Sequence, residues 1–273
     1  MTNQNSTSPV TIVTGGTFGL GLDISIELAK RGHQVVAIGL KESQVSSTAK
    51  GFDAIESAIE SNGLKDKVDV IEADVSSEKD VAKVVDFTIK KYQRIDNLVN
   101  NAAIGPLGTI LDTAPDIFEK IYRVNVMGVY LTSKMIVPIM TKQGGGSIVN
   151  VGSGAGYGKP NMAAYATSKG AVLALSTAMA YDHFKDHIRV NVVIPGGGGI
   201  ISGMSLGRFG GDVNAFNDPK RKIVGSVAGR PINGVDFANS IAFLLSAESS
   251  TITGTVIDVG CFANQGGPAP LTN

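Results

Sequence analysis

A tyrosine and a lysine four residues apart are the most informative pair of side chains in the sequence. Tyr165 and Lys169 lie within residues 163–170, just ahead of a long apolar helical stretch. Side chains at i and i+4 leave the same face of a helix, so the phenol and the amine are expected to lie close together. A free phenol titrates near pH ~10 and accepts protons poorly at neutral pH, whereas an ammonium about 4 Å away lowers its pKa by ~3 units. The pair is therefore predicted to act as an acid/base, although this spacing alone also fits an exposed tyrosine and a solvated lysine.

A glycine-rich turn at residues 14–21 forms a second candidate site. It follows a short β-branched run and opens an amphipathic stretch, which is the context of a dinucleotide-binding turn. Gly15 permits a tight turn, Gly19 lets the backbone approach a pyrophosphate, and Gly21 lets the helix pack against the sheet. The N–H groups and the positive dipole end of that helix would then face the phosphates. The turn is predicted to bind a nucleotide rather than to serve as an ordinary loop.

The elements that carry these motifs alternate between short β-branched runs and longer amphipathic stretches. Such alternation is typical of β-α-β units, so an α/β fold with a parallel sheet is predicted. Strands are predicted at residues 10–14, 34–38, 67–72, 96–99, 147–151, 188–194 and 255–259. Helices are predicted at residues 20–31, 43–61, 78–92, 118–141, 163–184 and 235–246.

One domain is predicted between residues 10 and 262. Residues 1–9 are polar and are expected to be a disordered lead-in rather than a signal peptide, and residues 263–273 a flexible tail. Residues 195–222 are rich in glycine and polar residues and lack periodicity. A long segment of this kind in a compact domain is usually functional, so it is predicted to form a lid over a substrate pocket.

Composition narrows the class of function to small-molecule chemistry. The 273 residues carry a net charge of zero and show no basic stripe interleaved with aromatic residues, so neither nucleic acid nor an anionic membrane is an expected partner. No stretch approaches about 18 unbroken apolar residues. The single cysteine, Cys261, excludes an internal disulfide and suits a reducing cytoplasm. His183 and His187 are an i, i+4 pair without the carboxylate spacing of a zinc protease, so no metal site is predicted.

Further motifs occur in a fixed order along the predicted elements. Each places a polar residue or a glycine at the end of a predicted strand or on a predicted helix. They are Asp74 in Ala-Asp-Val, residues 100–103 (Asn-Asn-Ala-Ala), Asn125 in Val-Asn-Val, Ser153 at the end of residues 148–153, and the runs 189–196 and 252–260.

Taken with the glycine-rich turn and the Tyr165–Lys169 pair, these motifs resemble those of the short-chain dehydrogenase/reductase family, over about residues 10–262. The resemblance implies a Rossmann-type, doubly wound, parallel seven-stranded sheet with helices on both faces. It implies an NAD(P)-dependent oxidoreductase that transfers a hydride between nicotinamide and a secondary alcohol or ketone, such as a small polyol or sugar. A 3-oxoacyl carrier-protein reductase and a catalytically silent nucleotide-binding scaffold are the alternatives. A homotetramer, or a homodimer, is expected through the long helices around Asn125 and Tyr165.

The resemblance also implies a role for each of four side chains. Tyr165 is expected to be the base in alcohol oxidation and, when protonated, the acid in carbonyl reduction. Lys169 is expected to lower the pKa of Tyr165 and to hydrogen-bond the nicotinamide ribose. Ser153 is expected to donate a hydrogen bond to the substrate oxygen. Asn125 is expected to position a water that links Lys169 to solvent.

Cofactor binding is implied for residues at the ends of several predicted strands. Asp74 matches a family aspartate that contacts adenine. Gly39 lies where NAD-using relatives carry an aspartate that repels a 2′-phosphate, and Lys41 could pair with that phosphate. Phe18 argues against NADP, because NADP-using relatives often carry a basic residue at this position. On balance, NADP is favoured over NAD. The complete expected set is Gly15, Thr17, Phe18, Gly19, Leu20, Gly39, Leu40, Lys41, Asp74, Val75, Asn101, Ala102, Ala103, Tyr165, Lys169, Pro195, Gly196 and Ser202.

Three positions depart from the family pattern. The interval from Ser153 to Tyr165 is one position shorter than usual. Ala103 replaces a glycine near the cofactor ribose. Ile200 stands where the family often has a threonine that contacts the nicotinamide amide, and Ser202 is the expected replacement.

The substrate pocket is expected to be lined by Gly154, Tyr157, Met162 and Met204.

Overall fold

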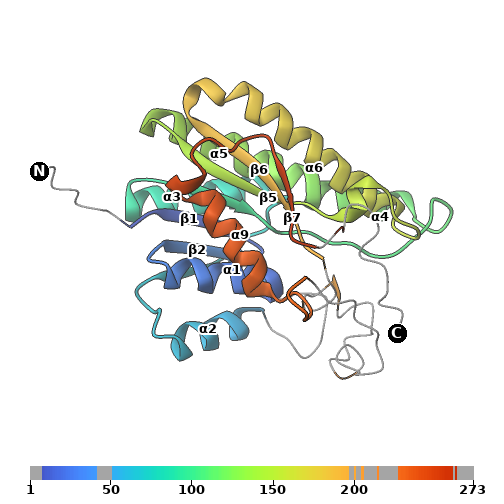
Figure 1. The fold of residues 1–273 in the computed structure, drawn as a ribbon, viewed down its shortest axis with the longest axis horizontal. Helices are drawn as coiled ribbons and strands as arrows, with labels where there is room; N and C mark the ends of the chain where they lie inside the picture. The colour runs from blue at the N-terminus through green and yellow to red at the C-terminus, as the bar shows by residue number, and fades with distance from the viewer. Residues whose placement is uncertain are drawn as a thin grey trace, which may run out of the picture.

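A parallel seven-stranded sheet forms the centre of the computed structural model (Figure 1). The structure describes residues 8–41, 51–196, 200, 204–205, 214, 227–260 and 262. The strands are β1 (Val10–Thr14), β2 (Gln34–Gly39), β3 (Val68–Glu72), β4 (Asn97–Asn100), β5 (Gly146–Val151), β6 (Ile188–Ile194) and β7 (Val256–Asp258). The helices are α1 (Gly19–Lys30), α2 (Gly51–Ser61), α3 (Glu78–Tyr92), α4 (Pro115–Tyr122), the π-helical η1 (Arg123–Met127), α5 (Gly128–Gln143), α6 (Ala163–Asp182) and α9 (Gly234–Leu245), with short 3-10 turns η2 (Gly154–Tyr157), η3 (Phe184–Asp186) and η4 (Ala247–Ser249).

The strand order is β3-β2-β1-β4-β5-β6-β7, and each neighbouring pair is parallel. The order reverses between β1 and β4, so the chain winds outward in both directions from this point. Valine and isoleucine dominate the strands and are buried in β1, β2, β4, β5 and β6, as expected where helices cover both faces of a sheet, whereas the edge strands β3 and β7 are partly exposed. The predicted doubly wound Rossmann-type fold is confirmed.

Two helical layers enclose the sheet. Helices α1, α2 and α9 lie on one face, and α3, α5 and α6 lie on the other (Figure 1). In the first layer, Ile24 of α1 and Phe237 of α9 belong to the same buried cluster as Val149 of β5. In the second, Ile136 of α5 packs in a cluster with Ile148, the strand neighbour of Val149. This alternation is the two-residue period of a strand, and it determines which side chains of β5 face α6.

The helix predicted at residues 118–141 is divided in the structure. Between α4 and α5 lies the π-helical segment η1, where the Gly128 N–H bonds to the Arg123 carbonyl five residues back. This hydrogen bond widens one turn by a residue, which is typical of functional positions in helices. Asn125 lies within this segment and is 1% exposed. Apolar periodicity predicts the helix but not the widened turn, in which Asn125 makes hydrogen bonds to residues distant in sequence.

By length and composition alone, the helical stretch Pro115–Gln143 could cross a membrane. Half of its most apolar window is buried inside the fold. There α5 packs against α3, β4 and β5. Packing against the sheet accounts for the apolar composition of this helix.

Several predicted segments fall partly outside the described residues. Within the predicted lid, 195–222, the structure describes residues 195–196, 200, 204–205 and 214. Residues 1–7 of the lead-in and the tail at 263–273 lie outside the described residues. So does the first part of the helix predicted at 43–61, since α2 is described from Gly51.

Candidate active site

The carboxyl ends of β1 and β4 meet where the strand order reverses, which is the position where open α/β sheets bind ligands. Thr14, at the end of β1, and Asn101, just past β4, join these ends. The Thr14 hydroxyl accepts hydrogen bonds from the N–H groups of Asn101 (3.0 Å) and Ala102 (3.1 Å). The Asn101 amide donates to the carbonyl oxygens of Thr14 (3.1 Å) and Gly15 (3.0 Å). Two predicted cofactor residues, Asn101 and Ala102, therefore lie against the glycine-rich turn.

The glycine-rich turn closes tightly over the start of α1. Gly15 and Gly19 have left-handed φ values of 61° and 55°. A Cβ added to Gly21 would lie 1.9 Å from the Gly15 carbonyl oxygen, so this glycine lets α1 approach the turn itself rather than only the sheet. Ser25 of α1, which no sequence motif singled out, also stabilises the turn. Its hydroxyl lies 3.0 Å from the Gly16 carbonyl oxygen and 2.9 Å from that of Gly21.

The N-terminus of α1 is chemically suited to an anion. The N-cap residue Phe18 makes no side-chain capping hydrogen bond, and the first turn carries no acidic residue. Leu20 is buried in the core beneath the helix, so it offers its backbone rather than its side chain to a ligand. The first N–H groups of a helix carry partial positive charge and point at whatever lies before them. These features fit the pyrophosphate of a dinucleotide.

The end of β2 lies beside the same turn, and the Thr17 hydroxyl fills the space that a side chain at position 39 would need. A Cβ added to Gly39 would lie 2.3 Å from Thr17 Oγ1. A Cβ on Gly51, the first described residue of α2, would lie 3.1 Å from the same atom. Lys41, which follows at the surface, forms an ion pair with Glu72 at 3.5 Å. The structure thus gives Lys41 a carboxylate partner that the sequence did not predict.

Asp74 and Val75 follow β3 and turn the chain toward α3. Asp74 Oδ1 accepts hydrogen bonds from the Ser76 N–H (2.8 Å) and hydroxyl (2.7 Å). The Asp74 N–H donates to the Asp80 carboxylate at 3.0 Å. Val75 is buried, and its Cγ2 lies 2.8 Å from the position of a Cβ added to Gly128. A hydrogen-bonded turn and packing on α5 therefore fix these two predicted cofactor residues.

Tyr165 and Lys169 lie on one buried face of α6. Tyr165 is 7% exposed and Lys169 is 4% exposed. The Lys169 Nζ lies 5.9 Å from the centre of the Tyr165 ring and donates a hydrogen bond of 2.7 Å to the carbonyl oxygen of Val151 in β5. Burial lowers the pKa of Lys169 to about 8. The amine therefore lies between the phenol ring and a strand end, and it is cationic below about pH 8.

Asn125 joins the segment after β4 to the helix that carries Tyr165. Its Oδ1 accepts a hydrogen bond from the Ile104 N–H at 2.9 Å. Its Nδ2 donates to the Ile104 carbonyl oxygen at 2.9 Å and to the Ser168 hydroxyl at 3.0 Å. Both N–H groups of the amide are thus used. A water of the kind predicted would have to contact another atom of this segment.

Ser153 lies directly after β5 and begins the 3-10 turn η2. Its hydroxyl oxygen accepts a hydrogen bond of 3.1 Å from the Ala155 N–H. The hydroxyl proton is then available for donation, as the predicted role requires. Between this turn and α6 the chain reverses at Gly158 (φ 98°) and Asn161 (φ 57°). Both residues lie within the interval between Ser153 and Tyr165 that is one position shorter than the family pattern.

Gly105 lies beside both the Tyr165 ring and the Met204 side chain. A Cβ added to Gly105 would lie 2.8 Å from Tyr165 Cδ2 and 2.7 Å from Met204 Sδ. Met204 was a predicted pocket residue, whereas Gly105 was missed although it lies two residues past the 100–103 motif. Met162, a further predicted pocket residue, forms an isolated parallel bridge with Gly108. This bridge joins the segment after β4 to the start of α6.

The predicted residues after β6 are only partly described. Pro195 and Gly196 follow β6 directly and are half-buried. Ile200 packs on the core of the α1 layer. Ser202 lies outside the described residues. Leu40 and Tyr157 are about half exposed, at 48% and 53%.

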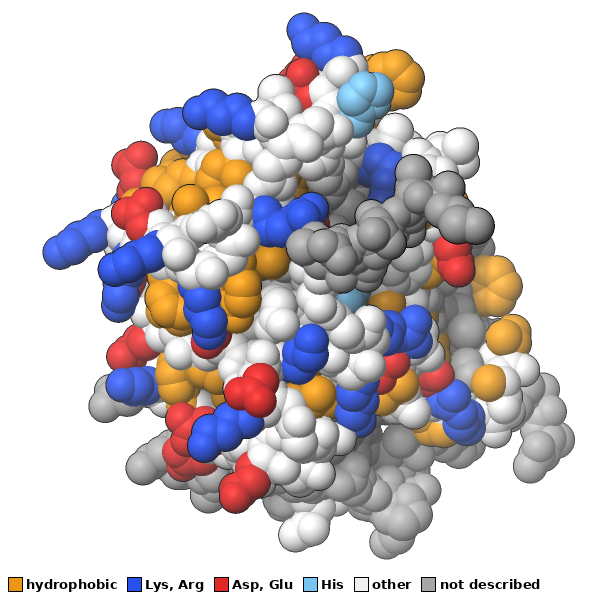
Figure 2. Space-filling model, turned by 90° about the vertical axis from the view of Figure 1, so that its left-hand side faces the viewer, with side chains coloured by type: hydrophobic (Ala, Val, Ile, Leu, Met, Phe, Trp, Pro, Cys, Tyr) orange, Lys and Arg blue, Asp and Glu red, His pale blue; other side chains and the backbone are white. Residues whose placement is uncertain are grey.

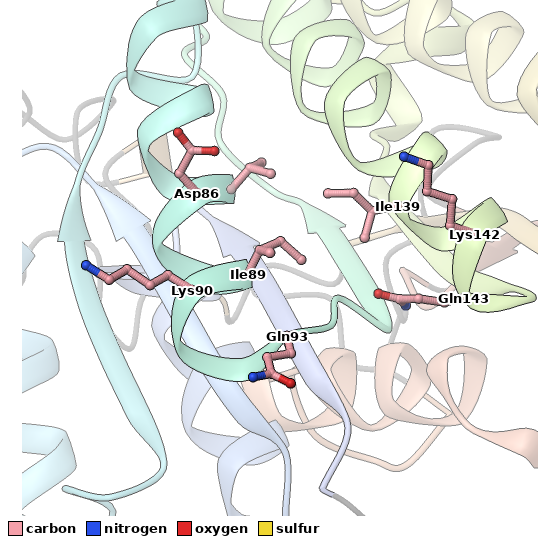
Figure 3. Close-up of a pocket in the computed structure, with 8 residues that line it drawn as sticks. Asp86, Ile89, Lys90, Gln93, Ile139, Lys142 and Gln143 are labelled. Atoms are coloured by element: carbon pink, nitrogen blue, oxygen red, sulfur yellow. The ribbon is translucent and has the colours of Figure 1, made fainter.

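Outside the candidate site, three kinds of feature among the described residues bear on function: metal-ligand groups, charged patches and hollows. Among them, no group of three or more His, Cys, Asp or Glu is placed to hold a metal ion. Basic and acidic side chains are interspersed on the face in Figure 2. An open hollow of about 560 Å³ lies between α3 and α5 (Figure 3), and none of the predicted site residues lines it. It is lined by Val85, Asp86, Ile89, Lys90, Gln93, Ile139, Lys142 and Gln143.

Comparison with known proteins identifies the class. The sequence pattern of the short chain dehydrogenase family matches residues 9–204. An uncharacterized oxidoreductase of Thermotoga maritima is 34% identical over 261 residues, which cover 94% of this chain and 97% of that protein. A cyclopentanol dehydrogenase of Comamonas sp. is 33% identical over 258 residues, with 93% and 97% covered. The chain therefore belongs to the short-chain dehydrogenase/reductase family.

Two solved structures resemble the whole described fold. A levodione reductase matches with a TM-score of 0.78 and 29% identity, covering 92% of this chain and 96% of that one. A 3-ketoacyl-(acyl-carrier-protein) reductase from Brucella melitensis, complexed with NADH, matches with a TM-score of 0.74 and 29% identity, covering 94% and 98%. Together with the family, these likenesses identify an NAD(P)-dependent oxidoreductase of alcohol and ketone groups.

Proposed function

We propose that this protein transfers a hydride between a nicotinamide cofactor, preferentially NADP, and a small secondary alcohol or its ketone, such as a polyol or sugar. The observation that carries the proposal is the cluster of Tyr165, Lys169 and Ser153 at the carboxyl end of β5. This cluster lies at the same edge of the sheet as the N-terminus of α1, because the strands are parallel. The proposed proton-transfer group and the proposed dinucleotide cradle therefore share one edge of the sheet.

When bound at this edge, the nicotinamide supplies or accepts the hydride. In oxidation, Tyr165 takes the hydroxyl proton of the alcohol at its phenolate oxygen as the carbon loses the hydride. In reduction, the same phenol returns that proton to the carbonyl oxygen. Lys169 stabilises the phenolate as a nearby cation, and the Ser153 hydroxyl donates a hydrogen bond to the substrate oxygen where negative charge develops.

Asn125 supports this chemistry through its amide contacts. It binds Ile104 with two hydrogen bonds and Ser168 with one. Ser168 directly precedes Lys169, and its hydroxyl donates to the Tyr165 carbonyl oxygen at 2.7 Å. Asn125 therefore holds the first turns of α6 against the segment after β4, on which Gly105 borders the Tyr165 ring.

The preference for NADP is supported by the surroundings of Gly39. Position 39 carries no carboxylate, and Thr17 occupies the space that one would need. The Lys41–Glu72 ion pair is largely exposed, with side chains 62% and 48% accessible. Exposed ion pairs contribute only about 0–1 kcal/mol, so a doubly charged 2′-phosphate can compete with Glu72 for Lys41.

A 3-oxoacyl carrier-protein reductase is the second candidate, supported by the likeness to the Brucella melitensis enzyme. It would share the same acid/base cluster and differ in its substrate and in a basic docking face. A silent nucleotide-binding scaffold is disfavoured because Asn125, Ser153, Tyr165 and Lys169 are all present in the sequence.

Homotetramer assembly is part of the proposal. Large apolar side chains are exposed along η1, α5, α6 and η3. Helices α5 and α6 lie on the same side of the sheet (Figure 1). The exposed side chains include Met127 (46% exposed), Tyr130 (45%), Tyr181 (82%) and Phe184 (72%). Pairing of this side with a second copy would cover them. One such pairing makes a dimer, and two dimers would make the tetramer, so light scattering of the purified protein should report four chains, or two if only this face pairs; a monomer would exclude this arrangement.

A panel assay tests the function directly. The purified protein is mixed with polyols, sugars, cyclic and linear secondary alcohols, the matching ketones and a 3-oxoacyl thioester, each with NADPH/NADP and NADH/NAD. Coenzyme absorbance should change with at least one small alcohol–ketone pair, faster with the phosphorylated coenzyme. Turnover of the thioester alone would establish the second candidate, and coenzyme binding without turnover of any compound would support a scaffold.

A further inference from the structure

Asn150 contacts both elements that carry the proposed catalytic groups. It is fully buried in β5, three residues before Ser153 and next to Val151, whose carbonyl oxygen binds Lys169. Its Nδ2 donates a hydrogen bond of 2.8 Å to the Ser176 hydroxyl on α6. One amide therefore joins the strand that leads to Ser153 to the helix that carries Tyr165 and Lys169.

Ser176 receives this bond on the same helix face as Lys169. The two residues are seven positions apart, which is about two helical turns. The Ser176 hydroxyl accepts from Asn150 and donates to the Val172 carbonyl oxygen at 2.6 Å, so both of its hydrogen-bonding roles are used. Helix α6 thus contacts adjacent residues of β5 at two levels, through the Lys169–Val151 and Ser176–Asn150 hydrogen bonds.

The other side of the Asn150 amide leads toward α5. Its Oδ1 accepts a hydrogen bond of 2.8 Å from Asn100 Nδ2 in β4. Asn100 Oδ1 in turn accepts from the Thr132 hydroxyl of α5 at 2.7 Å. Asn150, Asn100, Thr132 and Ser176 are each at most 4% exposed. A continuous line of buried side-chain hydrogen bonds therefore runs from α5 through two strands to α6.

The line closes into a ring at the active site. Helix α5 continues from η1, where Asn125 bonds to Ser168 of α6. Helix α6 is therefore tied to the rest of the molecule near Tyr165 by Asn125, and two turns beyond Lys169 by Asn150. Both ties are directional hydrogen bonds rather than apolar packing.

A buried amide is an unusual choice for this position because the surrounding cluster is apolar. Ile148, two residues earlier in β5, and Met179 and Leu175, beside Ser176, belong to or pack against that cluster. Apolar contacts are non-directional, so they tolerate sliding of a helix along a strand, whereas a hydrogen bond weakens steeply beyond its normal length. Leaving a buried amide unpaired costs about 1–3 kcal/mol, which penalises other registers.

We propose that Asn150 is a positioning residue of the active site. Its hydrogen bonds fix the axial register of α6 against β5, so that Tyr165 and Lys169 keep a constant placement relative to Ser153. This inference rests on the proposed function only through the roles of those three residues. The geometry it describes can be measured without turnover.

The Asn150→Val variant tests the inference, with Asn97→Val as its matched control. Asn97 is another buried strand asparagine, 3% exposed, and its Nδ2 donates a hydrogen bond to the Thr11 hydroxyl of β1. It begins β4, so it lies at the opposite end of that strand from the candidate site. Both variants should lower the melting temperature. Only Asn150→Val should lower kcat, by at least tenfold, because displacements of about 1 Å in an active site have effects of up to 10²-fold. NADPH affinity should change less than twofold in both.

Two further readouts separate positioning from general destabilisation. In Asn150→Val, the acid limb of the kcat/KM pH profile should move to higher pH, since Lys169 then stabilises the Tyr165 phenolate less well. A crystal structure of this variant should show the Lys169 Nζ to Val151 oxygen separation lengthened from 2.7 Å. Ser176→Ala should reproduce both effects, and Ser176→Thr, which keeps the hydroxyl, should restore the parent values.

The outcomes distinguish this inference from the proposed function. An unaltered separation in the Asn150→Val structure would overturn the inference, as would parent-like kcat and pH profile in a folded variant. Equal loss of kcat in Asn97→Val would do the same. Absence of turnover in the unaltered protein would instead count against the proposed function, while the crystallographic comparison would still decide the role of Asn150.

Discussion

The buried amine of Lys169 donates its hydrogen bond to a backbone carbonyl, that of Val151, at a distance of 2.7 Å. A neutral carbonyl compensates only part of the cost of burying an ammonium, and burial accordingly lowers the pKa of Lys169 to about 8. The fold thus retains a destabilising charge beside Tyr165, which is typical of functional positions.

Lys169→Met is expected to stabilise the cofactor-free protein while abolishing its activity. At pH 7 the lysine is charged in both the folded and the unfolded state, and only the folded state carries the desolvation penalty. Allowing for the lost hydrogen bond, the free energy of unfolding should rise by roughly 1–3 kcal/mol. The unfolded chain binds the extra proton between pH about 8 and 10.5, so the parent protein gains stability over this range and the advantage of the variant shrinks.

Urea unfolding at pH 7 and pH 10 measures this difference. Lys83→Met is the control, because Lys83 is exposed on α3, outside the candidate site and the proposed subunit interface. It should leave turnover unchanged. A Lys169→Met variant less stable than the parent at pH 7 would show that the ammonium is well compensated in the fold.

Gly39→Asp is expected to reverse the coenzyme preference. The new carboxylate would repel a 2′-phosphate, and its Cβ would displace Thr17, whose Oγ1 lies 2.3 Å from that position. Gly39→Ala adds the same Cβ without charge and serves as the steric control. Fluorescence titration should show the ratio of NADPH to NADH affinity falling at least tenfold in the aspartate variant alone. An equal change in both variants would assign the effect to sterics.

Gly105→Ala is expected to reduce kcat about tenfold with little effect on coenzyme affinity, because small misplacements of a catalytic group have large effects on rate. The added methyl would lie 2.8 Å from Tyr165 Cδ2, so the ring must shift. Stopped-flow and steady-state assays on the alcohol found in the panel would measure the change. A kcat equal to that of the parent would contradict the prediction that the position of the Tyr165 ring limits the rate.

His33 is expected to make stability depend on pH below its ordinary pKa of 6.5. Burial lowers the pKa of His33, an effect that nearby Asp96 opposes and Arg31 adds to. The unfolded chain therefore takes up the proton first, and the folded state loses stability as the pH falls below 6.5. Melting temperatures at pH 8 and pH 5.5 should show a smaller drop for His33→Gln than for the parent. Identical drops would place the acid sensitivity elsewhere.

The sequence predicts the fold well because the alternation of β-branched and amphipathic runs and the order of the motifs point to the same topology. It also places Tyr165 and Lys169 correctly on one helix face, since helical spacing alone determines that. Three features need the tertiary structure: the π-helical turn at Asn125, the enclosure of Thr17 between two glycines, and the Asn150 hydrogen bonds. Each depends on side chains from elements distant in sequence.

Comparison of Tyr165→Phe with the parent is the most direct measurement of the central claim. The substitution removes the phenol oxygen and keeps the buried ring, so NADPH should bind with affinity within about twofold of the parent, while kcat falls by roughly 10²–10⁴. Turnover by Tyr165→Phe at the parental rate would contradict the assignment of this phenol as the proton-transfer group.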